Sequence, residues 1–174
     1  MQAEYFTYGA DIFTNAWSGV AADGERAAAA MALHIRGAAW FGMESKACLL
    51  GGAAARSIES SAEWLKSNGF NAVRLPLAAD AILQPGHPCL TLGDRDQLRL
   101  HNPALGSLDY VEQVQEIARV LADAGLLLLL DMHVLQAGKW PDGGSVGGAG
   151  RGTLRAAWER LADALCESGP YWNV

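Results

Sequence analysis

The sequence predicts an α/β fold in which parallel strands alternate with helices, and three observations support this prediction. Five consecutive leucines follow Gly125 and end at Asp131, and such a continuous apolar run is typical of a strand buried on both faces of a parallel sheet. Amphipathic helical patterns lie between this run and the other apolar segments, which is the rhythm of successive βαβ units. The segments after the expected strands are long and those before them are short, as in an eight-stranded barrel with its site at the carboxyl ends of the strands.

The competing architecture is an open, doubly wound sheet, which usually carries a glycine-rich nucleotide loop after its first strand. Here Gly51 and Gly52 lie several residues past the first expected strand, and the sequence contains no G-x-G-x-x-G or P-loop motif. The barrel is therefore the preferred prediction.

The expected elements follow the order strand, helix, strand, helix, strand, helix, strand. The first helix has a capping-box spacing at Ser60 and Glu63, and Gly69 is suited to end it. The second helix repeats apolar side chains on one stripe and stops at Gly125. Strands are expected at residues 33–43, at 70–77 with Pro76 as the end, over the leucine run and from 171. Helices are expected at 57–68, at 108–124 and from Thr153. Loops are expected at 78–106 and 136–152.

Residues 1–32 are predicted to form an N-terminal extension or a small hairpin, and residues 33–174 a single domain. Asp23 and Gly24 form a dipeptide that favours a hairpin turn. The four alanines from Ala27 suit either a short helix or an insertion.

Length and composition exclude several classes of protein. A chain of 174 residues with 51% hydrophobic and 18% charged residues is long and apolar enough for a globular domain with a core. A formal net charge of -6 argues against a nucleic-acid partner. No apolar run approaches the ~20 residues of a membrane span, so no membrane insertion is expected, and no signal-peptide pattern is visible at the N-terminus.

The three cysteines are Cys48, Cys89 and Cys166, and they lack the spacing of a metal site. An odd number gives no closed disulfide framework, so isolated thiols are the preferred interpretation, while a bridge within one pair stays open. No metal site is predicted at Asp131 and His133 either, because no third ligand is placed near them.

Four segments, in order, carry a resemblance to a known family. They are Arg-Gly-Ala-Ala-Trp-Phe-Gly-Met-Glu at residues 36–44, Trp-Leu-Lys-Ser-Asn-Gly-Phe-Asn-Ala-Val-Arg-Leu-Pro at 64–76, Gly-Leu-Leu-Leu-Leu-Leu-Asp-Met-His at 125–133, and residues 158–174. Together they resemble the N-terminal half of a glycoside hydrolase family 5 enzyme, the cellulase/endoglucanase family of (β/α)8 barrels. The resemblance implies that residues 33–174 are a truncated barrel domain with about strands 1–4 and helices 1–3.

For the complete protein, the resemblance implies a secreted, retaining glycosidase that hydrolyses a β-linked polysaccharide or oligosaccharide and needs no cofactor. Retaining hydrolysis uses two carboxyl groups ~5 Å apart, and the family supplies them as two glutamates, both of which fall beyond Val174. The chain alone is therefore expected to be inactive. The alternatives are an inactive fragment, a carbohydrate-binding remnant without catalysis, or an unrelated barrel enzyme in which Asp131 and His133 act as acid and base.

The resemblance carries over two supporting residues of the catalytic site. Arg74 matches an arginine that hydrogen-bonds the nucleophile, since a fixed guanidinium keeps a carboxylate ionised and oriented. His133 matches a histidine that lines the substrate subsite. Asp131 lies two residues before His133 and shares its strand face, and a structural role is the preferred prediction for it.

Substrate contacts are predicted for Trp40, Trp140 and Glu44. An indole offers a flat apolar platform for a sugar ring. Trp140 lies in the loop after the leucine strand, and an exposed tryptophan at such a place indicates contact with substrate. Trp40 is assigned equally to the core or to a subsite, and Glu44 to substrate or to a local ion pair. The spacing of Trp64 and Trp158 suits packing on helices.

Overall fold

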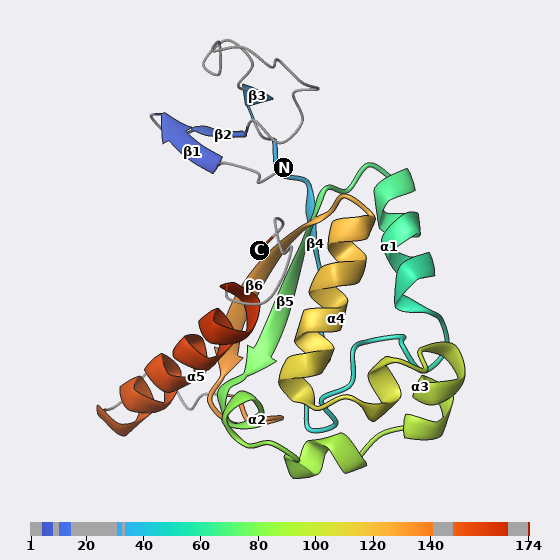
Figure 1. The fold of residues 1–174 in the computed structure, drawn as a ribbon, viewed down its shortest axis with the longest axis vertical. Coiled ribbons are helices and arrows are strands. Elements are labelled where there is room, and N and C mark those ends of the chain that lie inside the picture. The colour runs from blue at the N-terminus through green and yellow to red at the C-terminus, as the bar shows by residue number, and fades with distance from the viewer. Residues whose placement is uncertain (1–4, 9–10, 15–30, 33, 141–147, 167–173) are drawn as a thin grey trace. The chain divides into compact units, whose positions relative to one another are not determined.

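Figure 1 shows a computed structural model of the chain, which describes residues 5–8, 11–14, 31–32, 34–140, 148–166 and 174. The chain divides into two compact units, residues 1–36 and 37–174. In the first unit, strands β1 (Tyr5–Tyr8), β2 (Asp11–Thr14) and β3 (Met31–Ala32) form an antiparallel sheet in that order. The turn predicted at Asp23 and Gly24 lies outside the described residues.

The second unit is built on a parallel sheet of three strands, as the βαβ rhythm predicts. Strands β4 (Gly37–Ala39), β5 (Ala72–Ala78) and β6 (Leu127–Val134) pair in the order β4-β5-β6. The prediction of a first strand over residues 33–43 was too long. A glycine at φ +126°, Gly42, turns the chain after β4, and the Ser45 amide donates to its carbonyl at 3.0 Å.

Pro76 lies inside β5, so the prediction that it ends the strand was wrong. Amides alternate sides along a strand, and the Arg74 carbonyl accepts from the Trp40 amide on the β4 side. The nitrogen of Pro76 therefore points to that same side, where the pairing of β4 has already ended at Ala39. A proline is tolerated there because the ladder needs no donor at this position.

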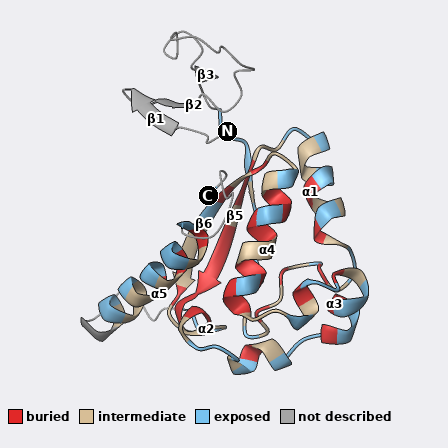
Figure 2. Cartoon of the chain, viewed as in Figure 1, coloured by how far each residue is buried: buried red, intermediate tan, exposed pale blue. Residues whose placement is uncertain are grey.

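Helices cover one face of this sheet. On that face Val73, Leu75 and Leu77 are completely buried, and they share a core with apolar residues of α1 (Ile58–Ser67) and α4 (Tyr110–Asp123). Figures 1 and 2 show α4 beside β5 and over β4, with α1 on the other side of α4. Leu129 points the other way and is 61% exposed, so the expectation that the leucine strand is buried on both faces was wrong for one of them.

The two long helices begin and end with side-chain and glycine caps. Ser57 caps α1 by accepting from the Ser60 amide, so the capping box predicted at Ser60 and Glu63 was wrong by one turn. Gly69, at φ +80°, ends this helix as predicted. A capping box between Asp109 and Glu112 starts α4, and the predicted helix over residues 108–124 is confirmed.

The segment predicted as a loop over residues 78–106 is mostly helical. Its helices are too short to show a hydrophobic period and are fixed by local caps, for example by the Asp94 side chain, which accepts from the Gln97 amide. The last helix begins at Gly148, before the predicted Thr153, and the glycines in its first turns, which disfavour helix, explain why the sequence did not predict this start. The elements are α2 (Ala79–Leu83), η1 (Pro88–Thr91), α3 (Arg95–His101), η2 (Leu105–Ser107) and α5 (Gly148–Cys166).

Within the described residues, none of these helices is both long and apolar enough to cross a membrane. Most of the strand predicted from residue 171 lies outside the described residues, since only Val174 of it is described.

Cys48 and Cys89 form a disulfide, with their Cα atoms 5.5 Å apart, whereas Cys166 has an exposed free thiol. The preferred prediction of isolated thiols was therefore wrong for this pair. The pairing joins the loop after β4 to the segment after β5, and no local spacing in the sequence encodes that contact.

Three buried polar side chains also hold the loop between β4 and α1. Arg95 is 9% exposed, Asn102 4% and Tyr110 1%. Each of them donates to backbone carbonyls of this loop, so each buried polar group is satisfied. The accepting carbonyls are those of Met43 for Tyr110, Ala47 and Cys48 for Arg95, and Ala53 and Arg56 for Asn102.

Candidate functional site

Polar side chains gather on the sheet face that α1 and α4 leave uncovered. Arg74 of β5 is paired in register with Leu129 of β6, and Pro76 with Asp131, so Arg74 and Asp131 project from the same face. The register then shifts, because Leu77 pairs with Met132 and Ala78 with Val134. His133 is the extra residue of this bulge, a device that re-aims a side chain next to functional sites.

Arg74, Asp131 and His133 meet within hydrogen-bond distance. The Arg74 Nη2 atom lies 2.5 Å from Asp131 Oδ2, and His133 Nδ1 lies 2.8 Å from the same oxygen and 3.1 Å from Arg74 Nη2. The side chains are partly accessible, with exposed fractions of 41%, 28% and 26% respectively. Asp131 is thus the centre of the group, although the sequence analysis predicted only a structural role for this residue.

In the neutral form of His133, the chemistry of these groups fixes the tautomer. Guanidinium is a donor only and carboxylate an acceptor only, so His133 Nδ1 cannot hydrogen-bond both of them at once. A proton on Nδ1 satisfies the shorter contact with Asp131, and the carboxylate then accepts from both neighbours. In this tautomer Nε2 carries a lone pair and can accept a hydrogen bond from a hydroxyl group.

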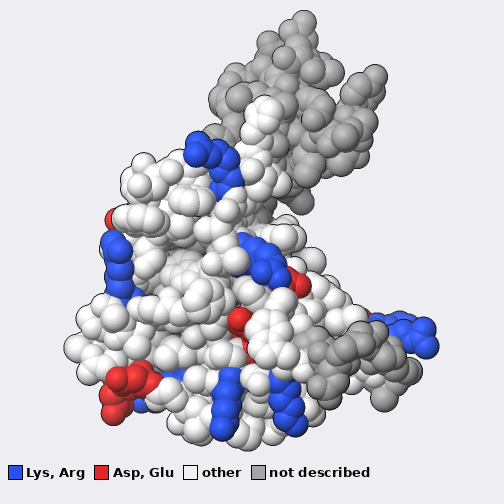
Figure 3. Space-filling view, turned by 180° about the vertical axis from the view of Figure 1, so that it is seen from behind, with Lys and Arg blue, Asp and Glu red and all other residues white. Residues whose placement is uncertain are grey.

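Trp140 extends this group. Its side chain is 70% exposed, and its ring meets the His133 ring edge to face with centroids 5.0 Å apart and an interplanar angle of 85°. An exposed indole beside an imidazole and an ion pair offers both an apolar platform and polar contacts to one ligand. Figure 3, viewed from behind, shows that uncharged atoms form most of the described surface of the second unit on that side.

The side chains of Trp40 and Glu44 do not belong to this group and make other contacts. The Trp40 Nε1 atom donates to the Gly51 carbonyl at 2.8 Å, and its ring packs against the core. Glu44 accepts from the Gly42 amide at 2.6 Å. The Trp40 amide donates to the Arg74 carbonyl within the sheet, but among the described residues no side-chain hydrogen bond or ring contact joins Trp40 or Glu44 to the side chains of Arg74, Asp131 or His133.

A second polar group at the carboxyl end of β5 was not predicted. Asp80 Oδ1 accepts from the Ala81 and Ala137 amides at 2.8 and 2.9 Å, and its Oδ2 lies 3.4 Å from His87 Nε2. The position of Asp80, directly after a strand, is the signal that was available in the sequence.

An open groove of about 220 Å³ lies on the outer side of the second unit, lined by residues of α1 and α4. One of its charged residues, Arg119, is engaged in ion pairs with Glu116 and Asp123 of its own helix. None of the residues around Arg74 lines this groove, so it is separate from the candidate site.

Solved structures with a similar fold include several endocellulases, whereas no family model matches the chain. An endocellulase of Pyrococcus horikoshii in complex with cellotetraose aligns with a TM-score of 0.72 and 26% identity. A second structure of an endocellulase from this organism has a TM-score of 0.73 and 25% identity. Both alignments cover 99% of this chain and 41% of that chain.

The catalytic domain of the major endoglucanase of Xanthomonas campestris pv. campestris supports the fold alone. It matches with a TM-score of 0.54 and 23% identity, over 63% of this chain and 30% of that domain chain. The predicted resemblance to a cellulase is thus confirmed. Over nearly its whole length, the chain is similar in sequence and fold to less than half of an endocellulase.

Proposed function

We propose that the chain is part of a retaining glycosidase of the glycoside hydrolase family 5 type, which hydrolyses a β-linked polysaccharide. Its parallel sheet would then be the first part of a (β/α)8 barrel. The observation that carries the proposal is the group of Arg74, Asp131 and His133 on the uncovered face of the sheet. In a barrel this face is the inside, and its carboxyl end is where substrate binds.

The exposed apolar side chain on the same face supports the barrel. Leu129 is 61% exposed, and exposing a leucine of this kind costs about 1 kcal/mol or more relative to burial. Further strands that close the barrel would cover it. These later strands would also bring the acid/base and the nucleophile, the two glutamates expected beyond Val174.

In this proposal Arg74 orients the nucleophile. Its Nη2 atom is held by Asp131, and a guanidinium has further donors on Nη1 and Nε. These donors would hold the incoming carboxylate in its ionised form, because an opposite charge close by favours that form. Asp131 is then a positioning residue that fixes both the arginine and the tautomer of His133.

The substrate would be a β-linked glucan or a related chain of sugars. Trp140 would stack on a sugar ring, and His133 Nε2 would accept from a sugar hydroxyl at the adjoining subsite. No cofactor enters this chemistry, since protonation and nucleophilic attack by carboxyl groups suffice. A secreted location follows from the size of a polysaccharide, which cannot enter a cell.

The test uses the complete protein. The reading frame after Val174 is expected to encode an Asn-Glu-Pro motif and a later glutamate at a strand end. The complete protein is then expected to hydrolyse carboxymethyl-cellulose with retention of the anomeric configuration. Absence of both glutamates from the gene would refute the proposal.

Variants of the same protein separate the roles. Asp131→Asn is expected to lower kcat at least tenfold with the fold intact, because it weakens the ion pair that positions Arg74. Asp96→Asn is the matched control, since Asp96 is 97% exposed and lies on α3. If the complete protein binds cellotetraose but never hydrolyses it, the carbohydrate-binding alternative replaces this proposal.

A further inference from the structure

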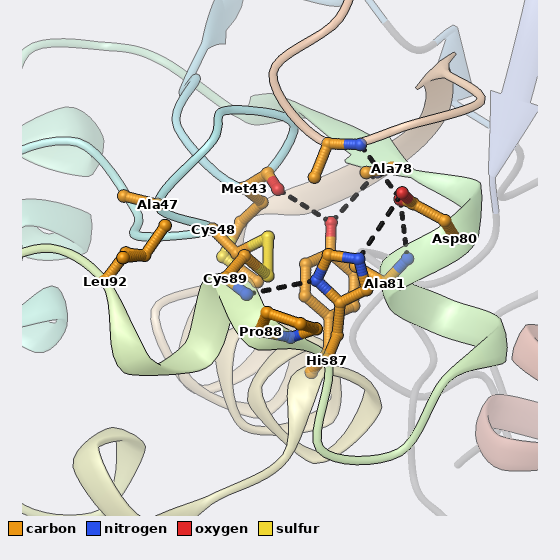
Figure 4. The surroundings of a disulfide bond; sticks show 12 residues. Met43, Ala47, Cys48, Ala78, Asp80, Ala81, His87, Pro88, Cys89 and Leu92 are labelled. Atoms are coloured by element: carbon orange, nitrogen blue, oxygen red, sulfur yellow. Dashed lines mark hydrogen bonds and ion pairs between the residues drawn. A yellow bond between two sulfur atoms is a disulfide. The ribbon is translucent and has the colours of Figure 1, made fainter.

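Cys48, His87 and Cys89 form a compact group at the end of the second unit that carries the β4–α1 loop. One potential ligand atom of each residue lies within 4.8 Å of those of the other two, and both cysteines are nearly completely buried, at 0% and 2% exposed. Cys48 comes from the loop after β4, whereas His87 and Cys89 come from the segment after β5. Figure 4 shows the imidazole beside the two sulfur atoms.

The imidazole is oriented by one hydrogen bond and by a nearby carboxylate. His87 Nδ1 accepts from the Cys89 amide at 3.2 Å, so this nitrogen carries a lone pair, and a cation bound there would take the place of the amide hydrogen bond. Nε2 faces the carboxylate of Asp80 at 3.4 Å. A histidine that binds a metal through one nitrogen typically donates from the other nitrogen to a carboxylate, and this partner fixes the tautomer and raises the basicity of the ligand.

A buried guanidinium contacts the backbone of both cysteines. The Arg95 guanidinium is buried and donates to the carbonyls of both Cys48 and Cys89, at 3.2 and 3.0 Å. These bonds fix the backbone positions of the two cysteines, whose thiolates are the form that binds metal ions. Two thiolates and one imidazole are a ligand set that prefers zinc or cadmium.

We propose that, once the disulfide is reduced, Cys48, Cys89 and His87 bind one soft divalent cation such as Zn²⁺, with Asp80 as the hydrogen-bond partner of His87. A phosphine reductant takes the oxygen of one water molecule and becomes the phosphine oxide, and the disulfide becomes two thiols. The cation then displaces two thiol protons, which are released to solvent. A water molecule would fill the fourth position of the tetrahedron.

The disulfide and the metal site exclude each other, because both use the same sulfur atoms. Either one joins the loop after β4 to the segment after β5. The chain would therefore keep this link in an oxidising and in a reducing environment. The inference does not depend on the proposed glycosidase activity.

The test uses the whole chain with Cys166→Ser, which removes the exposed third thiol. The protein is reduced with a phosphine without oxygen, freed of reductant and titrated with Cd²⁺, while the ultraviolet charge-transfer absorption of the thiolate–cadmium bond is recorded. One cadmium ion per chain is expected. The oxidised chain is expected to give no such absorption.

Variants identify the ligands. Cys48→Ser is expected to abolish tight binding, and His87→Gln to weaken it more than Asp80→Asn does. Asp80→Asn keeps the acceptor for its two amide partners, and the loss of an outer-shell carboxylate of this kind costs about 10–100-fold in affinity. His101→Gln is the matched control on α3 and is expected to leave the affinity unchanged.

Circular dichroism keeps the test decisive if reduction unfolds the chain. In that case Cd²⁺ is expected to restore the helical signal and a cooperative melt. The proposal is overturned if the reduced chain shows no charge-transfer absorption with stoichiometric Cd²⁺, or if His87→Gln binds as tightly as the parent. Equal binding by the oxidised chain would overturn it as well.

Discussion

Replacement of Tyr110 by phenylalanine removes one buried oxygen atom and keeps the ring. That hydroxyl donates to the Met43 carbonyl and accepts from the Ala78 amide, each at 3.0 Å. The side chain is 1% exposed, so water cannot replace either bond. Leaving a buried donor and a buried acceptor unpaired costs about 1–3 kcal/mol for each group, and partial relaxation gives an expected loss of about 2–4 kcal/mol.

The same hydroxyl gives a second readout at alkaline pH. Burial raises the pKa of Tyr110 well above its ordinary value of 10.0. Above pH 10 the unfolded tyrosine releases its proton while the folded one keeps it, so folding stability falls as the pH rises. Relative to Tyr110→Phe, the parent is expected to lose about 1.4 kcal/mol between pH 8 and pH 11.

The assay is urea unfolding at pH 8 and pH 11, followed by circular dichroism, with Cys166→Ser in both proteins to prevent disulfide exchange. Thr91→Val is the matched control, because it also replaces a hydroxyl with an isosteric apolar group, at an exposed site where the hydroxyl donates at 2.8 Å. It is expected to change stability by less than about 0.5 kcal/mol. A Tyr110→Phe effect as small as that, or one that stays constant with pH, would refute the reasoning.

Three further predictions concern the same unit and are measured by urea unfolding. Gly42→Ala is expected to cost more than about 3 kcal/mol, because φ is +126° and a Cβ would lie 2.3 and 2.7 Å from backbone atoms of its own loop. Gly52→Ala is the control, since φ is +80° there but nothing lies within 4 Å of the added Cβ, and it should cost about 1–2 kcal/mol. Replacement of both Cys48 and Cys89 by alanine is expected to cost about 4 kcal/mol for the sequence separation of 41, and an unchanged midpoint would contradict this. Asp109→Ala removes the capping box of α4 and is expected to cost about 1 kcal/mol, so a neutral result would show that packing alone sets the start of this helix.

The long elements could be predicted because each carries a pattern of its own. The leucine run encodes β6, and the stripe of apolar residues over 108–124 encodes α4, independently of their neighbours. The segment over residues 78–106 could not be predicted in this way. Its helices span one or two turns, and its path is held by contacts to distant parts of the chain, such as the 2.8 Å hydrogen bond that the Asn102 side chain accepts from the Ile58 amide.

The candidate site could also be predicted only in part, because its residues were visible in the sequence and their contacts were not. The sequence shows an arginine and a histidine, Arg74 and His133, in segments that predict strands. Their meeting was not, since it follows from the pairing of Arg74 with Leu129 and from a bulge at His133. The central position of Asp131 depends on that register, and the pairing of Cys48 with Cys89 depends on how two loops pack.

The way in which the β4–α1 loop is held has a consequence for how this protein can vary. Arg95, Asn102 and Tyr110 all lie outside the loop, and all bind its backbone carbonyls rather than its side chains. Every amino acid supplies the same carbonyl, so these hydrogen bonds do not depend on which residues the loop contains. Apart from its turn glycines, Cys48 and the buried side chains of Met43, Leu50 and Ala53, the loop can accept substitutions that alter what it presents to a ligand while its backbone path is retained.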